Sequence, residues 1–241
     1  LAGTVAEEPR CTVERADASL TYSLFLQRYG GPGTEPRRGP GYSSGAPRGL
    51  TGRGEAFRAL CTREKLLAAF GPFPVRLSTA NTYSYRKVDV PFQDRLPSPG
   101  SASRVPPDTL YFFGDNNFTE WGPLFQHYVP PPFRIPGTSP AYSFGIAGSG
   151  SGVPFHWHGP GFSEVIFGRK RWFLYPPDQT PHFHPNETTL AWLQHTYPSL
   201  PPAQRPLECT LRPGEVLYFP DRWWHATLNL DTSVFISTFL G

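Results

Sequence analysis

Two histidines separated by a single residue lie in FHWHGPG, residues 155–161. In a β-strand, residues i and i+2 point to the same face and lie about 6.6 Å apart. His156 and His158 could therefore bind one metal ion at metal–nitrogen distances of about 2.1 Å. A single pair of this kind often arises from two unrelated histidines, so a further ligand is needed to favour a metal site.

A third histidine lies far downstream in GEVLYFPDRWWHATLN, residues 214–229. This segment fits the spacing G-x5-P-x4-H-x3-N, in which His225 is the histidine. Upstream, Gly150 and the histidine pair fit G-x5-H-x-H. The two spacings together resemble those of the cupin double-stranded β-helix, in which the pair and the last histidine meet across the barrel. The resemblance implies one metal site formed by His156, His158 and His225.

Within the cupins, the jumonji-C (JmjC) group is the more similar one. PFHWH is similar to its P-x-H-x-D segment, and GRKRWFLYPP, residues 168–177, to its G-x-K-x-W-x-L-x-P hairpin. The family chemistry implies iron(II) held by two histidines and a carboxylate, with 2-oxoglutarate and oxygen at the open positions. His156 and His225 match the histidine ligands. Lys170 matches the lysine that binds the distal carboxylate of 2-oxoglutarate.

The hairpin also gives an argument for Lys170 that is independent of the family. The residues two and four positions after Lys170, and those two and four positions after Arg171, are all aromatic or aliphatic. Both faces of the strand are therefore apolar, and one of the two cations must border an apolar interior. An anionic ligand would offset the cost of an unpaired charge there. The alternative is a hairpin tip at which both side chains reach water.

Three positions depart from the JmjC pattern. His158 stands where the family has Asp or Glu, so three neutral imidazoles would leave the ion its full double positive charge. Iron should then be harder to oxidise, and zinc becomes a better competitor. Val153 stands where many hydroxylases carry Thr or Ser, and Gly161 where they often carry Asn. A lysine without these helpers should hold a dicarboxylate poorly, and we expect an impaired co-substrate site.

Other residues in the chain are weaker candidates for chemistry. Glu164 could add a fourth metal ligand, but its spacing is slightly too long. His182 and His184 form a second pair, and the prolines on both sides of it predict an exposed loop. Two tryptophans beside His225 are expected to pack within the barrel. No serine or cysteine nucleophile with an assembled base is evident.

From about residue 109 the sequence predicts β-structure. Short runs of β-branched and aromatic residues are separated by Gly, Pro and Asn, as in AYSFGIAG, SEVIFG and TSVFISTFL. Residues 187–196 predict one short helix between them. This pattern favours a sandwich or barrel over a parallel α/β sheet. We therefore predict a mainly β, cupin-like jelly-roll barrel over residues 109–241.

Residues 1–108 are predicted to form an N-terminal helical lead-in. Apolar residues recur at helical spacing over residues 13–29 and again over residues 55–70. Residues 30–54 contain nine glycines, four prolines and four arginines, and we predict disorder there. Members of the family have an edge strand at this place, so the barrel is expected to lose an edge strand and some stability.

Composition limits the classes of partner. The formal net charge is +3, and no Lys/Arg stripe is interleaved with aromatics, so nucleic acid is not expected. No apolar run of about 18 residues is present, so no membrane insertion is expected. The chain contains no methionine, which suggests a processed form and would fit a removed signal peptide. Oligomeric state is not indicated.

Sequons and cysteines bear on the compartment. Asn117-Phe118-Thr119 and Asn186-Glu187-Thr188 are glycosylation sequons in turn-rich surroundings. Cys11 and Cys61 could form a disulfide in an oxidising lumen, and three reduced thiols are the alternative. Cys209 lies in a strand-like run and is expected to be a small buried hydrophobe.

Taken whole, including RLSTANTYSY and the ending LNLDTSVFISTFLG, the chain is similar to a JmjC member that resides in the lumen of the endoplasmic reticulum. This resemblance implies luminal residence, with the sequons glycosylated. Two classes of function stay open. One is a regulatory barrel that binds other proteins and retains an altered three-histidine metal site. The other is an iron(II)/2-oxoglutarate-dependent protein hydroxylase. The three departures favour the first.

Overall fold

Two facing β-sheets form the body of the protein. The computed structural model describes residues 11–16, 20–29, 40–44, 51–79, 87–94, 110–114, 117–131 and 133–241. Nine strands form the large sheet in the order β1-β2-β11-β8-β13-β6-β5-β3-β4. Their bounds are β1 (Glu14–Ala16), β2 (Gly41–Ser44), β3 (Pro74–Thr79), β4 (Lys87–Pro91), β5 (Leu110–Phe113), β6 (Ala141–Ala147), β8 (Gly161–Phe167), β11 (Glu215–Phe219) and β13 (Ser233–Phe239).

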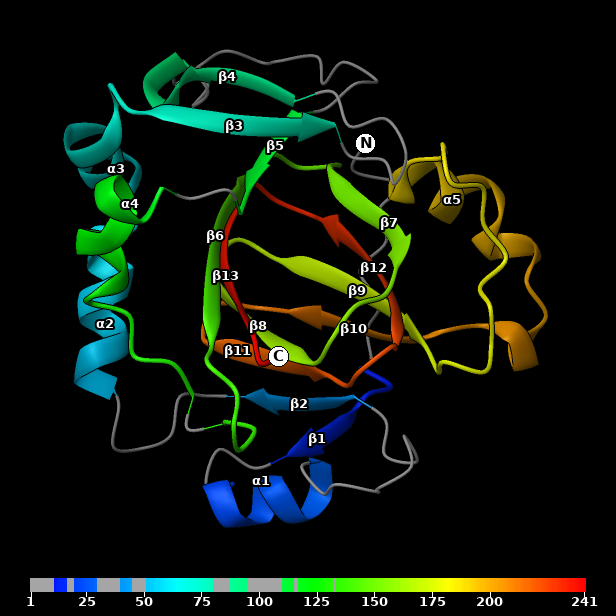
Figure 1. Ribbon diagram of the computed structural model, residues 1–241. Coiled ribbons are helices and arrows are strands. Elements are labelled where there is room, and N and C mark those ends of the chain that lie inside the picture. Colours follow the sequence, from blue (N-terminus) through cyan, green and yellow to red (C-terminus); the bar gives the residue numbers. More distant parts are fainter. Residues whose placement is uncertain are drawn as a thin grey trace.

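The small sheet has four strands in the order β10-β9-β12-β7. Its strands are β7 (Gly152–His156), β9 (Lys170–Tyr175), β10 (Leu207–Leu211) and β12 (Trp224–Asn229). Figure 1 shows this sheet facing the middle strands of the large sheet, so that the two enclose a barrel. Almost all pairings are antiparallel, and β1 with β2 is parallel. The predicted mainly β, jelly-roll fold is confirmed.

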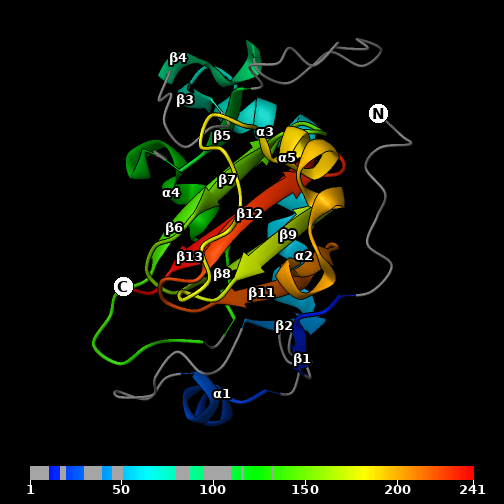
Figure 2. The ribbon, with the colours of Figure 1, turned by 90° about the vertical axis from the view of Figure 1, so that its right-hand side faces the viewer.

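Helices cover the outer faces of both sheets. Helices α2 (Thr51–Leu60), α3 (Arg63–Phe70) and α4 (Phe118–Phe125) lie outside the large sheet, and α5 (Thr189–His195) lies outside the small one (Figures 1 and 2). The remaining helices are α1 (Tyr22–Tyr29), η1 (Phe92–Asp94), η2 (Tyr197–Ser199) and η3 (Pro202–Gln204). No helix in the described part of the chain has the length and apolarity needed to cross a membrane.

Strand β9 is buried on both of its faces. All six of its residues, KRWFLY, are buried. One face of the strand lines the barrel interior, and the other packs under α5 with Trp192 and Leu193. A strand that is covered on both faces usually has a nearly continuous apolar sequence. The two cations at the start of β9 are therefore unusual for such a strand.

The N-terminal part contributes strands as well as helices. Strands β1 and β2 extend one end of the large sheet, and β3 and β4 extend the other. Of the predicted helix over residues 13–29, only α1 is helical, and β1 precedes it. The predicted helix over residues 55–70 is two helices, because Thr62 caps the start of α3 by accepting a hydrogen bond from the Lys65 amide.

The prediction of disorder over residues 30–54 is wrong for part of that segment. Residues 41–44 form β2 and pair with β11, and residues 51–54 begin α2. Residues 30–39 and 45–50 lie outside the described residues. The physical reason is the open edge of β11, whose backbone donors and acceptors can pair with any extended segment whatever its side chains. The edge strand that we expected to be missing is therefore supplied from within the Gly/Pro-rich segment.

The disulfide joins a different pair of cysteines from the one expected. Cys11 is bonded to Cys209, and Cys61 is a free, buried thiol. Cys11 is adjacent to β10, where the Thr12 amide donates to the Glu208 carbonyl at 2.9 Å. Cys61 instead packs in the apolar cluster under α2 and α3, and its burial raises the pKa of the thiol to about 12. Cys209 is buried in the apolar core, as expected, and its disulfide bond to Cys11 was not expected.

Candidate metal centre and adjoining pocket

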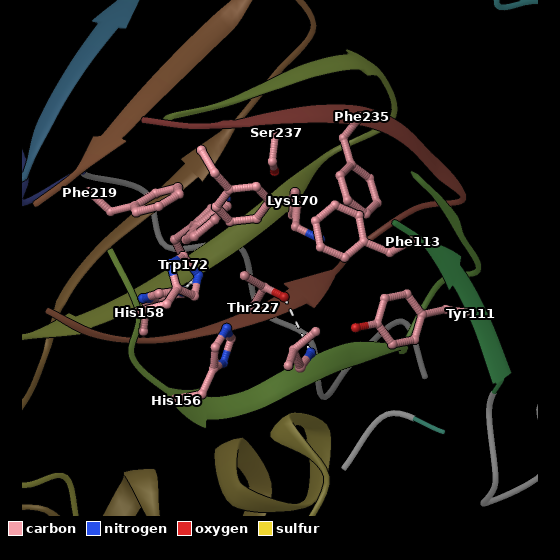
Figure 3. A pocket seen from close by; sticks show the side chains of 13 residues that line it. Tyr111, Phe113, His156, His158, Lys170, Trp172, Phe219, Thr227, Phe235 and Ser237 are labelled. Carbon is pink, nitrogen blue, oxygen red and sulfur yellow. Dashed lines mark hydrogen bonds between the residues drawn. The ribbon is translucent and has the colours of Figure 1, made fainter. Parts of the chain in front are cut away.

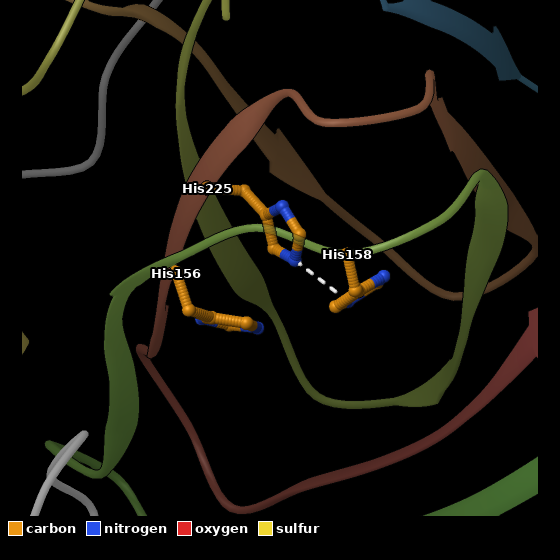
Figure 4. A group of neighbouring side chains, drawn as sticks. All are labelled: His156, His158 and His225. Carbon is orange, nitrogen blue, oxygen red and sulfur yellow. Dashed lines mark hydrogen bonds between the residues drawn. The ribbon is translucent and has the colours of Figure 1, made fainter.

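Three histidines meet at one end of the barrel. His156 ends β7 and pairs in register with His225 on β12, while His158 lies two residues beyond β7. One ring nitrogen from each residue lies within 4.8 Å of the other two. Figure 4 shows the three rings converging from these two neighbouring segments. The structure thus brings together the three residues that the spacing predicted.

The other ring nitrogen of each histidine is held by the backbone. Nδ1 of His156 bonds to the carbonyl of Pro154 at 2.8 Å, and Nδ1 of His158 to that of Gly159 at 2.8 Å. Nδ1 of His225 bonds to the Trp223 carbonyl at 2.9 Å. A carbonyl oxygen only accepts, so each Nδ1 carries the proton and each Nε2 presents a lone pair. Such bonds fix the tautomer and orientation that a metal ligand requires.

The spacing of the Nε2 atoms fits a bound cation. Nε2 of His158 lies 3.1 Å from Nε2 of His225 (Figure 4). Two lone pairs at this distance repel each other unless a cation lies between them. Two nitrogens bound at about 2.1 Å to one ion lie roughly 3.0–3.4 Å apart for ligand angles between octahedral and tetrahedral. The donor set therefore fits iron(II) or zinc.

Burial keeps the three rings neutral. It lowers the pKa of His156 to about 4, and that of His225 well below its ordinary value, with the neighbouring imidazoles adding to both effects. Burial also lowers the pKa of His158, partly offset by its Gly159 hydrogen bond and by Asp221. Since only the neutral ring donates a lone pair, the site is competent to bind a metal ion at neutral pH.

His158 occupies surroundings that suit an imidazole. Its ring packs edge-on against Phe219 at 5.4 Å and Phe239 at 5.0 Å between centroids. Within the described residues, the cluster of candidate ligands contains three imidazoles and no carboxylate. Glu164 does not join it, because its carboxylate faces the helical layer and accepts a hydrogen bond from the Tyr128 hydroxyl at 3.0 Å. The described residues thus supply three histidine ligands, and no acid, to this site.

A pocket extends from the triad into the barrel. Figure 3 shows Trp172 and Phe219 at the histidine end, and Phe113, Phe235 and Tyr111 at the far end around Lys170. The cavity has a volume of about 40 Å³. That is room for about three water molecules. The aromatic rings, rather than polar groups, set its size.

Lys170 points into this pocket from the first position of β9. It is 3% exposed, which excludes the solvated hairpin tip. Its Nζ lies 3.4 Å from Oδ1 of Asn229 and 3.7 Å from the centroid of the Phe235 ring. Burial lowers the pKa of Lys170 to about 7. Asn229 is in turn held by Ser151, whose carbonyl accepts from the amide at 2.9 Å.

Packing explains the two other departures from the family pattern. Val153 lines the pocket with an apolar side chain, and its amide donates to the nearby Thr227 hydroxyl at 3.2 Å. A Cβ atom at Gly161 would lie 2.7 Å from the Phe219 ring and 2.7 Å from the Thr238 carbonyl. No side chain fits at residue 161, so an amide helper is excluded by the packing of Phe219.

The remaining predicted residues lie at the surface or in the packing. Asn117 and Asn186 are both exposed, and the Asn117 side chain caps α4 by accepting from the Thr119 amide at 2.9 Å. His182 and His184 are exposed in the loop before α5, as expected. Sequence reasoning missed the roles of Asn229 and Tyr111 in the pocket. Asn229 was visible as the last residue of the second cupin spacing.

Two facing antiparallel sheets with three histidines at one end define a cupin-type barrel with a candidate metal centre. The family model of the cupin-like domain matches residues 101–239. The chain is 67% identical over 245 residues to human JmjC domain-containing protein 8, covering 99% of this chain and 87% of that protein. To the rat JmjC domain-containing protein 8 it is 68% identical over 240 residues, covering 98% of this chain and 85% of that protein.

A more distant relative is a chicken protein described as the 2-oxoglutarate and iron-dependent oxygenase JMJD4. It is 33% identical over 99 residues, covering 36% of this chain and 23% of that protein. The chain belongs to the cupin-like JmjC-domain family. Over nearly its full length it is similar to JmjC domain-containing protein 8, and the wider family includes iron and 2-oxoglutarate oxygenases.

Proposed function

We propose that this protein is a regulatory JmjC barrel of the endoplasmic reticulum lumen, which binds other proteins and retains an altered metal site without efficient hydroxylation. The observation that carries the proposal is the lysine end of the pocket. There, the Lys170 amine contacts an aromatic ring and one amide oxygen.

The groups that would hold 2-oxoglutarate are absent or already engaged. Val153 offers no hydroxyl to a carboxylate, and Gly161 has no room for an amide. A hydrogen bond to a charged group contributes about 1.5–3 kcal/mol, so the loss of two such bonds would weaken binding by orders of magnitude. Lys170 alone then supports only weak, non-selective attraction of the co-substrate.

The metal end supports retention of an ion. His156, His158 and His225 would hold it through their Nε2 atoms, with each Nδ1 fixed by a backbone carbonyl. Iron(II) would supply oxygen chemistry there when a co-substrate is bound, and zinc would supply a structural or Lewis-acid centre. The rings of Phe219 and Phe239 pack against the His158 imidazole and hold it in place.

Two observations support a luminal location. The Cys11–Cys209 bond closes a loop of 198 residues, and such bonds persist in oxidising compartments. Both sequon asparagines are exposed and accessible to a glycosyltransferase. Protein expressed with a secretory leader should shrink on glycosidase treatment, with separate losses in Asn117→Gln and Asn186→Gln. An unshifted band would contradict this location, since both acceptor sites are open.

The decisive experiment loads purified protein with iron(II) under anaerobic conditions and then adds 2-oxoglutarate. The proposal predicts no visible charge-transfer band, and no succinate above background after air is admitted. Metal analysis should still show bound ion, and the same luminal proteins should co-purify with the wild type and with Lys170→Ala. Loss of these proteins in Lys170→Ala would contradict a role independent of the co-substrate.

The second candidate function is an iron(II)/2-oxoglutarate-dependent protein hydroxylase. The position of Lys170 in the same pocket as the triad favours it. Robust succinate formation that is lost in Lys170→Ala, but kept in the exposed-lysine variant Lys87→Ala, would establish this function in place of the first. His158→Asp, which restores the family's acid, would be the companion variant.

A further inference from the structure

We propose that the inner end of the pocket captures small aldehydes, with the Lys170 amine forming a Schiff base to the carbonyl carbon. The inference goes beyond the proposed function, because it concerns covalent chemistry of the lysine and requires no metal ion. It rests on the surroundings of Nζ and on the groups that line the cavity.

The first observation is the environment of the amine. Lys170 is almost fully buried, and its Nζ lies over the face of the Phe235 ring at 3.7 Å from the centroid. Its polar neighbour is the neutral Asn229 amide oxygen at 3.4 Å. In the described part of the chain, no carboxylate forms an ion pair or hydrogen bond with this amine. A desolvated lysine without an acid is typical of nucleophilic, Schiff-base-forming lysines.

The second observation is the set of groups that face Lys170 from neighbouring strands. In the described residues, the other titratable side chains that line the same cavity are Tyr111 on β5, His156 on β7, His158 just beyond β7 and His225 on β12. A protonated His156 would only oppose a second positive charge. Burial lowers the pKa of Lys170 to about 7, so about half of the amine is neutral at pH 7. An ordinary lysine, with a pKa of about 10.4, is less than about 0.1% neutral there.

The third observation concerns the groups that line the cavity, which define the ligand class. The walls are mostly aromatic, with hydroxyl groups from Tyr111, Thr227 and Ser237. In the described residues, Lys170 is the only lysine or arginine that lines the cavity. An oxo acid would therefore lack a cationic partner for its carboxylate once the lysine has reacted.

The chemistry balances without an oxidant or reductant. The neutral amine attacks the carbonyl carbon, a carbon–nitrogen bond forms, and the carbonyl π electrons move to oxygen. That oxygen takes up a proton as the nitrogen loses one, giving a carbinolamine. A second proton, supplied through the lining hydroxyls or solvent, leaves with the hydroxyl as water, and the nitrogen lone pair forms the carbon–nitrogen double bond of the protonated imine. Burial keeps Tyr111 a neutral hydroxyl, since it raises the pKa far above its usual range.

The test uses the full chain stripped of metal with a chelator, with acetaldehyde as the probe and cyanoborohydride to trap the imine. Peptide mapping then locates the added ethyl groups. At pH 7, we expect Lys170 to be labelled at least about tenfold faster than the exposed Lys65 and Lys87, and we expect this advantage to shrink toward pH 10. Labelling of Lys170 no faster than that of Lys87 would overturn the proposal.

A matched variant tests whether Lys170 reacts quickly because its amine has no acid beside it. Asn229→Asp places a carboxylate at the position of the Asn229 amide, 3.4 Å from Nζ, without changing the side-chain size. The acid should raise the pKa of Lys170 and reduce its labelling at pH 7 by at least about tenfold, while labelling of Lys65 and Lys87 stays unchanged. Equal labelling in both proteins would contradict the mechanism. The pH profile of the wild type decides the proposal even if this variant misfolds.

The outcome is separable from the proposed function. Succinate formation reports on oxygenase chemistry at the metal, whereas reductive labelling is performed on metal-free protein. Failure of aldehyde capture leaves the regulatory proposal standing, and a hydroxylase result leaves the labelling experiment unaffected. Protection of Lys170 by 2-oxoglutarate at concentrations that spare Lys87 would count against capture as the function, because it would show the amine engaged by a carboxylate.

Discussion

Adjacent residues on β9 carry two buried cations with opposite surroundings. Arg171 faces outward under α5 and is paired with the buried Glu208 carboxylate on β10, which also accepts a hydrogen bond from Tyr197. Lys170 faces inward, and among the described residues its amine contacts the Asn229 amide oxygen and the Phe235 ring. The two residues differ by one position and by the face of the strand. One charge is neutralised within the fold, and the other is left for something that enters the pocket.

The contrast extends to the groups around the two cations. On the outer face, the Arg171 guanidinium, the Glu208 carboxylate and the Tyr197 hydroxyl satisfy one another. On the inner face, the histidine lone pairs of the triad converge, and Lys170 has no acid partner among the residues that the structure describes. Unsatisfied groups of this kind reduce stability and persist where they serve a ligand. The comparison therefore separates structural from functional residues, and each prediction below tests it.

The largest effect is expected on the outer face. Glu208→Gln removes the charge opposite Arg171 and leaves a buried guanidinium uncompensated. We expect the free energy of unfolding to fall by about 3–5 kcal/mol. Urea denaturation measures the loss. The matched control is Asp231→Asn, which removes the acid opposite the partly exposed Arg169 and should cost at most about 1 kcal/mol. Equal losses of unfolding free energy in both variants would show that the buried ion pair contributes no more to stability than the exposed one.

A somewhat smaller effect is expected at the triad, with the opposite sign. Zinc or iron(II) at one hundred times its dissociation constant should stabilise the protein by about 2.7 kcal/mol. His225→Ala and His158→Ala should each abolish this gain, because they remove converging Nε2 ligands. His182→Ala changes an exposed histidine in the loop before α5, and this variant should still be stabilised by the metal. Thermal unfolding with and without metal measures this stabilisation. Full stabilisation of His225→Ala by the metal would show that the triad is not the metal site.

Much of the fold and of the candidate site could be predicted from the sequence, because strand patterns and motif spacings are local signals. Strand β9 and its neighbours were indicated by β-branched and aromatic runs between turn residues. The triad followed from two spacings, since a barrel brings residues 150–158 and 214–229 to adjacent strands. Alternation along the strand predicted only that Lys170 or Arg171 borders an apolar interior, and the resemblance to the JmjC hairpin indicated Lys170. Each inference needed only the period of a strand and the resemblance to cupins.

The rest depended on contacts that no local pattern encodes. Cys11 bonds to Cys209 because the N-terminal segment lies against β10, and nothing near Cys11 in the sequence specifies that neighbour. Strand β2 forms from a Gly/Pro-rich segment because the edge of β11 offers backbone partners. The partner of Arg171, 37 residues away in sequence, was equally hidden. Long-range pairing decides these features, so composition alone predicted disorder and the wrong disulfide.

The inner cation gives a pH-dependent prediction. The folded pKa of Lys170 is lowered by burial to about 7, so between about pH 7 and pH 10 the unfolded chain binds more protons than the folded one. The energetic cost of this lysine is therefore greatest below pH 7 and is relieved as the pH rises. The wild type should gain about 1 kcal/mol per pH unit relative to Lys170→Met between pH 7 and pH 9. A constant difference in urea denaturation would show that Lys170 is not desolvated.

The smallest effect tests whether the lysine end can be restored toward co-substrate binding. Val153→Thr is nearly isosteric and places a hydroxyl on the pocket wall, at the position where many hydroxylases carry one. A hydrogen bond to a charged carboxylate contributes at least about 1.5 kcal/mol, so 2-oxoglutarate should bind roughly tenfold more tightly. Val153→Ala adds room without a hydroxyl and serves as the control, with titration calorimetry as the measurement. Because Phe219 closes the space at Gly161, the second helper stays absent and the gain should stop there. A gain as large in Val153→Ala would show that cavity size, rather than the missing hydroxyl, limits the co-substrate.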